Sequence, residues 1–224
     1  MSTRIKLSAG AAALAAALLM PALSQADIMG TAYSVTSAQA QNAAPGFTGT
    51  AEATFTVPSA ACGTALQDLC FTSIVGLNNS ANYTLGTFLA TGGATGISYM
   101  GPGAAGNSID NTILQFTGNI SVTNGETFTI THDDGLTLTI GSTTVLSVPG
   151  PTAPTSTSYT YTGLTGTYSF DLIYGECCGA PAVLDATLPY SASSVPEPSS
   201  FGLLGVGLLG LGCAVALRRR RYNS

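Results

Sequence analysis

The segment Glu126-Thr-Phe-Thr-Ile-Thr-His-Asp133-Asp134-Gly135-Leu-Thr-Leu-Thr-Ile140 decides the fold class of this chain. On each side of Asp-Asp-Gly, apolar residues alternate with threonines, which is the period of a half-buried β-strand. Asp-Gly between two such runs is a strong signal for a tight hairpin turn. We therefore expect strands at Glu126–His132 and Leu136–Ile140, joined by a turn.

The same alternation recurs along most of the chain. Further strands are expected at Phe47–Val57, Phe71–Leu77, Tyr83–Leu89, Leu114–Val122, Thr144–Val148, Tyr159–Tyr161, Leu164–Tyr174 and Val183–Leu188. Short strands separated by turn residues favour an antiparallel β-sandwich. The chain is predicted to be all-β, with one sandwich domain over residues 46–190, a mobile arm at 27–45, and loops at Gly92–Gly106 and Pro149–Pro154.

Two later segments extend the pattern, Gly166-Thr-Tyr-Ser-Phe-Asp-Leu-Ile-Tyr174-Gly-Glu176 and Gly179-Ala-Pro-Ala-Val-Leu184. With the Asp-Asp-Gly segment they resemble the protective-antigen-type (PA14-like) β-sandwich, a jelly-roll-like module of bacterial toxins, glycosidases and yeast adhesins. In the adhesins of that family, the two aspartates coordinate a calcium ion that also holds glycan hydroxyls. The resemblance therefore implies a calcium site at Asp133 and Asp134, with further ligands in the loop Gly175–Pro181.

The residues alone leave two interpretations of Asp133-Asp134-Gly135 open. In one it is only a tight turn and no cofactor is required, while in the other the turn carries calcium, which takes about six to eight oxygen ligands. His132 shares its parity with Phe128 and Ile130, so we expect it on the inner face with a ring nitrogen hydrogen-bonded. Glu176 is expected to brace its loop by accepting hydrogen bonds from backbone amides.

Four cysteines lie between the two ends of the chain, at Cys62, Cys70, Cys177 and Cys178, and in an oxidising compartment an even set predicts two disulfides. Three pairings are open. A Cys177–Cys178 bond would close a strained eight-membered ring, and a Cys62–Cys70 bond would close a small loop. A cross pairing between the two sets is favoured by chain entropy, on the order of 4 kcal/mol for a loop of ~100 residues.

The first residues predict a secretory signal peptide over 1–26. Arg4 and Lys6 precede a helical apolar run ending near Met20, and Ser24-Gln25-Ala26 places small residues at the −3 and −1 positions. We expect cleavage between Ala26 and Asp27.

The last thirty residues combine three features. A linker over 191–200 contains Val195-Pro196-Glu197-Pro198, an apolar segment at 201–217 predicts a transmembrane helix, and a basic cytoplasmic tail at 218–224 begins with Arg218, Arg219, Arg220 and Arg221. This arrangement resembles the PEP-CTERM sorting signal. The resemblance implies exosortase as a partner, transient membrane association and transfer to the cell surface or the medium.

Charge is distributed very unevenly. No Lys or Arg occurs between Lys6 and Arg218, and all eleven carboxylates fall from Asp27 to Glu197. Nucleic acid is excluded as a partner of the exported part, because nothing there neutralises phosphates. No HExxH, GxSxG or P-loop motif is present, and no cation is available to stabilise an oxyanion, so we expect no enzymatic activity.

These features predict an exported cell-surface or extracellular-matrix protein, processed by exosortase, that binds a neutral glycan such as exopolysaccharide. The alternatives are a structural matrix or biofilm protein without a specific ligand, and a permanently membrane-anchored periplasmic protein.

Overall fold

The computed structural model describes residues 28–58, 68–72 and 83–189. Its strands and helices are β1 (Ile28–Ser34), α2 (Ser37–Asn42), β2 (Thr50–Val57), β3 (Asp68–Thr72), α3 (Leu85–Thr91), β4 (Thr95–Tyr99), η2 (Ala104–Gly106), β5 (Thr112–Val122), β6 (Thr127–Asp133), β7 (Gly135–Ile140), β8 (Thr143–Val148), β9 (Thr155–Thr160), β10 (Gly166–Glu176) and β11 (Val183–Thr187).

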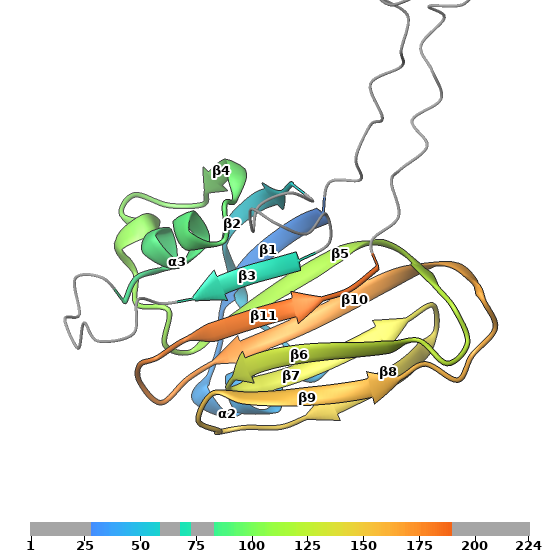
Figure 1. Cartoon of the computed structure of the whole chain (residues 1–224). Coiled ribbons are helices and arrows are strands. Elements are labelled where there is room, and N and C mark those ends of the chain that lie inside the picture. Colours follow the sequence, from blue (N-terminus) through green and yellow to red (C-terminus); the bar gives the residue numbers. More distant parts are fainter. Residues whose placement is uncertain (1–27, 59–67, 73–82, 190–224) are drawn as a thin grey trace, which may run out of the picture.

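The strands form two sheets that stack face to face (Figure 1). The larger sheet has the order β4-β2-β1-β5-β10-β7-β8, and the smaller has the order β3-β11-β6-β9. Every pairing between named strands is antiparallel. The predicted all-β antiparallel sandwich is confirmed.

The core between the sheets is rich in aromatic rings. Phe71 packs against Phe55 and Phe116, and Phe88 stacks on Phe71 at a centroid distance of 5.4 Å. Phe88 also stacks on Tyr174, at a centroid distance of 6.0 Å. These contacts fasten α3 and the first half of the chain to β10, the strand that leads into the candidate site.

The prediction of a mobile arm at residues 27–45 is wrong for the described part, residues 28–45, which contains a strand and a helix. This part forms β1, which pairs with β2 and β5 inside the larger sheet, and α2, which begins at a capping box between Thr36 and Gln39. The hydrophobic pattern of β1 is weak because small residues are required there: a Cβ on Gly30 would lie 2.2 Å from the Phe55 ring. Because glycine is needed beside Phe55, this strand lacks the regular hydrophobic alternation by which the other strands were recognised.

The strand predicted at Tyr83–Leu89 is wrong, because that segment is mostly α3. Thr84 caps the helix in a capping box with Thr87, and Leu85, Phe88 and Leu89 are buried on one face. Apolar residues at these positions fit a helical period as well as a short strand, and the cap decides between them. The loop predicted at Gly92–Gly106 also contains β4 and η2.

The remaining strands follow the predictions with shifted ends. The strand expected at Phe71–Leu77 overlaps β3 only at Phe71 and Thr72, and residues 73–77 lie outside the described residues. The strand expected at Tyr159–Tyr161 begins earlier, as β9. The predicted signal peptide, Pro-Glu-Pro linker, transmembrane helix and basic tail lie outside the described residues, as does Cys62. Among the described residues, no helix has the length and apolar character needed to cross a membrane.

Candidate ligand-binding site

The Asp133-Asp134-Gly135 sequence is a corner between the two sheets. β6 pairs with β11 and β9 in the smaller sheet, whereas β7 pairs with β10 and β8 in the larger one. The predicted hairpin is therefore wrong. Alternation along a strand shows which face is buried but not which strand lies beside it, so it could not distinguish a hairpin from a crossing between sheets.

The side chain of Asp134 holds this corner in place. Its Oδ1 accepts a hydrogen bond from the Thr152 amide at 2.8 Å, and its Oδ2 accepts one from the Cys177 amide at 3.0 Å. These two amides belong to the β8–β9 loop and the β10–β11 loop. The bracing through backbone amides that the sequence assigned to Glu176 is therefore performed by Asp134.

His132 is fully buried beneath the corner, on the inner face of β6 as predicted. Its Nδ1 lies 2.5 Å from the Asp134 carbonyl oxygen, and its Nε2 lies 3.1 Å from the Thr157 hydroxyl. A carbonyl can only accept, so Nδ1 carries the hydrogen and Nε2 accepts from Thr157. Burial lowers the pKa of His132, which keeps the ring neutral.

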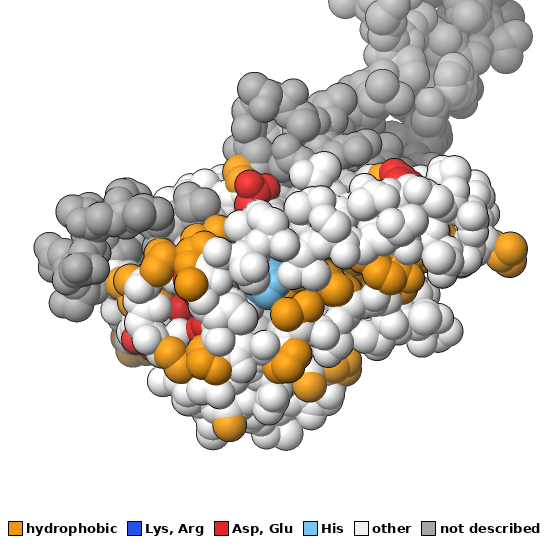
Figure 2. Space-filling model, turned by 60° about the horizontal axis from the view of Figure 1, so that its bottom comes forward, with side chains coloured by type: hydrophobic (Ala, Val, Ile, Leu, Met, Phe, Trp, Pro, Cys, Tyr) orange, Lys and Arg blue, Asp and Glu red, His pale blue; other side chains and the backbone are white. Residues whose placement is uncertain are grey.

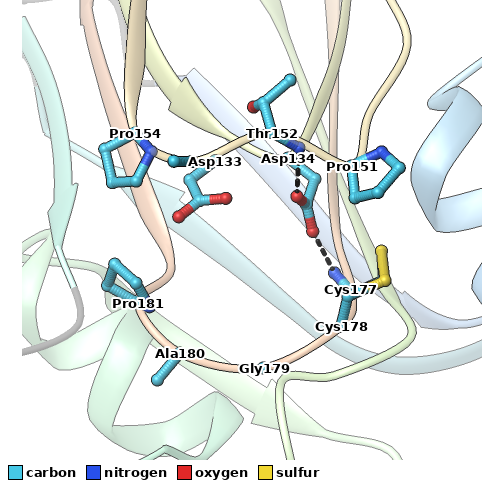
Figure 3. Close-up of a pocket in the computed structure, with 11 residues that line it drawn as sticks. Asp133, Asp134, Pro151, Thr152, Pro154, Cys177, Cys178, Gly179, Ala180 and Pro181 are labelled. Atoms are coloured by element: carbon cyan, nitrogen blue, oxygen red, sulfur yellow. Dashed lines mark hydrogen bonds between the residues drawn. A yellow bond between two sulfur atoms is a disulfide. The ribbon is translucent and has the colours of Figure 1, made fainter.

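A hollow of about 380 Å³ opens beside the corner (Figure 3). It is lined by Asp133 and Asp134, by residues 151–154 of the β8–β9 loop, and by residues 177–181 of the β10–β11 loop. Both carboxylates point into it, and Pro151, Pro154 and Pro181 stand around them. The structure thus places the two aspartates beside the 175–181 loop, as the family resemblance implied. The loop predicted at Pro149–Pro154 is present, but its place in the site was not predicted, because Pro-Gly-Pro-Thr-Ala-Pro indicates a loop and not what the loop lies against.

The two carboxylates lie close together with almost no exposure to water. Asp133 is 5% exposed and Asp134 is 2% exposed. Burial first, and then the charge and hydrogen bonding of Asp134, raise the pKa of Asp133 to about 7. The described part of the chain contains no Lys or Arg to offset this charge. A cation or several hydrogen-bond donors from a ligand would therefore be stabilised here.

Glu176 lies behind the corner and is fully buried. Its Oε1 accepts a hydrogen bond from the Tyr83 hydroxyl at 2.5 Å, and its Oε2 lies 2.6 Å from the Tyr174 hydroxyl. The Tyr174 hydroxyl also donates to the Asp133 carbonyl. A phenol has one hydrogen, so a protonated Glu176 accounts for both Tyr174 contacts by donating to the phenol oxygen.

The pKa of Glu176 is consistent with this hydrogen count. Burial raises it to about 10; the hydrogen bonds with Tyr174 and Tyr83 act in the opposite direction, and the charges of Asp134 and Asp133 add to the rise. Glu176 is therefore neutral at physiological pH and holds the Asp133 backbone through Tyr174. Tyr174 belongs to the segment that carries the family resemblance, but no role was predicted for either tyrosine. Nothing in the local pattern places Tyr83 near Glu176.

Cys177 and Cys178 form a disulfide with each other. Cys70 is also disulfide-bonded. The cross pairing that chain entropy favours is therefore absent. The two sulfur atoms lie within 4.8 Å of an Asp134 oxygen, but a disulfide offers no thiolate to a metal ion.

Helix α2 covers the back of the corner. Gly135 and Gly175 face each other across β7 and β10, and both lie against α2. A Cβ on Gly175 would lie 1.9 Å from the Ala40 carbonyl oxygen. A Cβ on Gly135 would lie 2.3 Å from the Gln41 carbonyl oxygen. Glycine is therefore needed at both positions for the helix to approach.

Comparison with known families identifies the C-terminal signal. Residues 194–221 match the PEP-CTERM protein-sorting motif, which includes Val195–Pro198 and the four arginines from Arg218. The chain therefore carries the signal of a secreted protein that exosortase sorts toward the cell surface. No curated protein matches the chain significantly.

Two solved structures have a similar fold. One is the PA14 domain of the antifreeze protein MpAFP, with 22% identity and a TM-score of 0.48 over 76% of this chain and 84% of that one. The other is the PA14 sugar-binding domain from an RTX adhesin, with 18% identity and a TM-score of 0.47 over 73% of this chain and 90% of that one. Both are PA14 domains, the module that the sequence resembles.

Proposed function

We propose that the exported domain binds a neutral glycan in the hollow beside Asp133 and Asp134, with a calcium ion on the two carboxylates. The observation that carries the proposal is the pair itself, since two adjacent buried carboxylates face an open hollow in a region without Lys or Arg. Such a pair is electrostatically costly when empty and favourable when it holds a cation.

The donor set suits calcium. This ion takes about six to eight oxygen ligands in a flexible geometry, and carboxylates, carbonyls and hydroxyls all serve. Asp134 keeps a lone pair on each oxygen beyond the two amides it accepts, because a carboxylate offers about four acceptor sites. Glycan hydroxyls would complete the coordination, which links calcium binding to sugar binding.

The surroundings favour a neutral sugar over a charged one. The domain has an acidic excess without any Lys or Arg, so an anionic polysaccharide would be repelled. The prolines at 151, 154 and 181, together with Ala153 and Ala180, give the hollow an apolar rim that can contact the C–H face of a sugar ring.

The test measures the melting temperature of the protein with calcium and with a chelator. Calcium should raise it by a few degrees, because a ligand that binds only the folded state stabilises that state. Asp133→Asn keeps the backbone carbonyl that Tyr174 holds, and should abolish the calcium effect. Asp171→Asn is the matched control, because Asp171 lies on β10 away from the hollow and is hydrogen-bonded by Gln115.

A glycan array with and without chelator completes the test. Calcium-dependent binding that Asp133→Asn removes and Asp171→Asn preserves would support the proposal. An array without any bound glycan would rule the proposal out. Binding that survives both the chelator and Asp133→Asn would show that the glycan binds elsewhere on the protein.

A further inference from the structure

One side of the sandwich is formed by strands without any charge. Between Asp134 and Asp171 the chain contains no Asp, Glu, Lys, Arg or His. This segment includes β8, the edge strand of the larger sheet, and β9, the edge strand of the smaller sheet. The two edges lie on the same side of the molecule (Figure 1). Figure 2, in which that side comes forward, shows mainly uncharged polar and apolar atoms.

The outer face of β9 carries a regular row of hydroxyl pairs with β6. Ser156, Ser158 and Thr160 contact Thr131, Thr129 and Thr127 at oxygen–oxygen distances of 2.8, 3.0 and 3.0 Å. The pairing of β6 with β9 runs over six residues without a register shift. Side chains of an antiparallel pair come closest where the two residues do not exchange backbone hydrogen bonds. The row therefore marks non-hydrogen-bonded pairs.

A backbone hydrogen bond confirms which β9 residues pair with β6, and it shows where the remaining amides and carbonyls of β9 point. The Tyr161 amide donates to the Glu126 carbonyl at 2.7 Å, so position 161 belongs to the hydrogen-bonded set. Alternation then assigns positions 159, 157 and 155 to the same set. The amides and carbonyls of Ser156, Ser158 and Thr160 point away from β6, toward the open edge, and these three residues are exposed.

Within the part of the chain that the structure describes, this edge lacks the features that keep edge strands apart. Natural edges are blunted by charged side chains, prolines, bulges or covering segments, because their free backbone groups pair readily with another strand. β9, Thr-Ser-Thr-Ser-Tyr-Thr, has no charge and no proline. The neighbouring edge, β8, is less regular, since its pairing with β7 shifts register between Leu138 and Thr139.

We propose that β9 pairs edge to edge with β9 of a second copy of this chain, which extends the smaller sheet across two molecules. Antiparallel pairing of identical strands gives a closed two-fold interface. A second copy fits because the edge matches itself. A two-fold axis at Ser158 sets the outward amides and carbonyls of Ser156, Ser158 and Thr160 opposite those of Thr160, Ser158 and Ser156 of the second copy. Charge fixes the place of contact, because two acidic molecules repel elsewhere on their surfaces and β9 carries no charge. This association does not depend on glycan binding.

The experiment measures dimer formation of the full chain in mild detergent by sedimentation velocity at increasing protein concentration. Ser158→Lys puts a charge on the edge and should weaken the dimer at least about tenfold, or about 1.4 kcal/mol. Thr129→Lys is the matched control, because it breaks the same hydroxyl pair and adds the same charge on the central strand β6. It should leave the dimer unchanged.

Two further measurements guard against a folding defect. Ser158→Pro removes one outward amide without removing a bond to β6, and should weaken the dimer as Ser158→Lys does. In the native protein, amide hydrogen exchange at Ser156, Ser158 and Thr160 should slow as the concentration rises. A protein that stays monomeric, a dimer insensitive to both Ser158 variants, or equal weakening by Thr129→Lys would each overturn the proposal.

Discussion

At the scale of single residues, the candidate site depends on groups that no local pattern connects. Glu176 is held by two tyrosines, and one of them, Tyr174, also holds the Asp133 carbonyl. A neutral carboxyl group in this position acts as donor on one oxygen and acceptor on the other. Glu176 therefore positions Asp133 through Tyr174 and makes no contact with the hollow itself.

Glu176→Gln should preserve this arrangement, because its amide group donates to Tyr174 and its carbonyl accepts from Tyr83. We expect the free energy of unfolding to change by about 1 kcal/mol or less. Glu176→Ala removes the acceptor of the Tyr83 hydroxyl and the donor to the Tyr174 phenol oxygen, and it creates a cavity, so it should cost about 2–4 kcal/mol. Urea unfolding of both variants checks this. Equal destabilisation by Gln and Ala would show that Glu176 is not protonated.

The same residue predicts how stability depends on pH. The pKa of Glu176 is about 10 in the folded state, against an ordinary value of 4.5. The folded state thus keeps a proton that the unfolded state releases, so the contribution is complete below pH 4.5 and is lost as the pH rises toward 10. The melting temperature should fall across this window. Glu176→Gln should reduce that slope, and an unchanged slope would contradict the assignment.

At the scale of elements, α2 is the part that completes the corner. It occupies a segment that the sequence suggested was mobile, and it packs on two glycines at the ends of β7 and β10. The Gln41 carbonyl also accepts a hydrogen bond from the Gly150 amide at 2.7 Å, and the Gln41 amide group donates to Cys178 Sγ at 3.5 Å. One short helix thereby contacts both loops that frame the hollow.

Gly135→Ala should therefore loosen α2 and both loops together. Its methyl group would overlap backbone atoms of Gln41, which cannot rotate away, so we expect a loss of about 1–3 kcal/mol. Gly101→Ala is the control, since a Cβ there meets nothing within 4 Å. Thermal unfolding of the two variants measures the difference. Equal melting temperatures would mean that α2 does not rest on Gly135.

At the scale of the whole molecule, a C-terminal sorting signal follows the folded sandwich domain. The sorting motif covers residues 194–221, directly after the sandwich, which is described up to residue 189. We expect processing by exosortase to release the sandwich from the segment that follows Pro198.

Intact mass measurement on cell-surface, medium and inner-membrane fractions tests this expectation. The surface or medium species should begin near Asp27 and lack the mass of residues 201–224. Deleting Arg218–Arg221 should retain the tail on the protein, since the basic residues are part of the matched motif. A native protein found only in the inner membrane with its tail intact would instead indicate a permanent anchor.

Much of the architecture could be predicted from the sequence for a definite physical reason. A strand buried on one face must alternate, so Glu126–His132 and Leu136–Ile140 were identified by their threonines, and the inward position of His132 followed from parity. The sorting signal was equally readable, because a rigid Pro-Glu-Pro, an apolar run and four arginines act through their linear order. β1 was missed because its glycine interrupts the hydrophobic alternation. α3 was predicted as a strand because the spacing of its apolar residues fits a helix and a short strand equally well.

Tertiary structure alone decided what the Asp-Asp-Gly sequence does. Which sheet each strand joins depends on contacts between residues far apart in the chain, so a predicted hairpin became a corner between sheets. The same contacts bring the 151–154 loop to the hollow, give the amide-bracing role to Asp134, and place a protonated Glu176 behind Asp133. The sequence by itself determined most of the strands, the acidic charge and the sorting signal. Packing between distant segments determined the site.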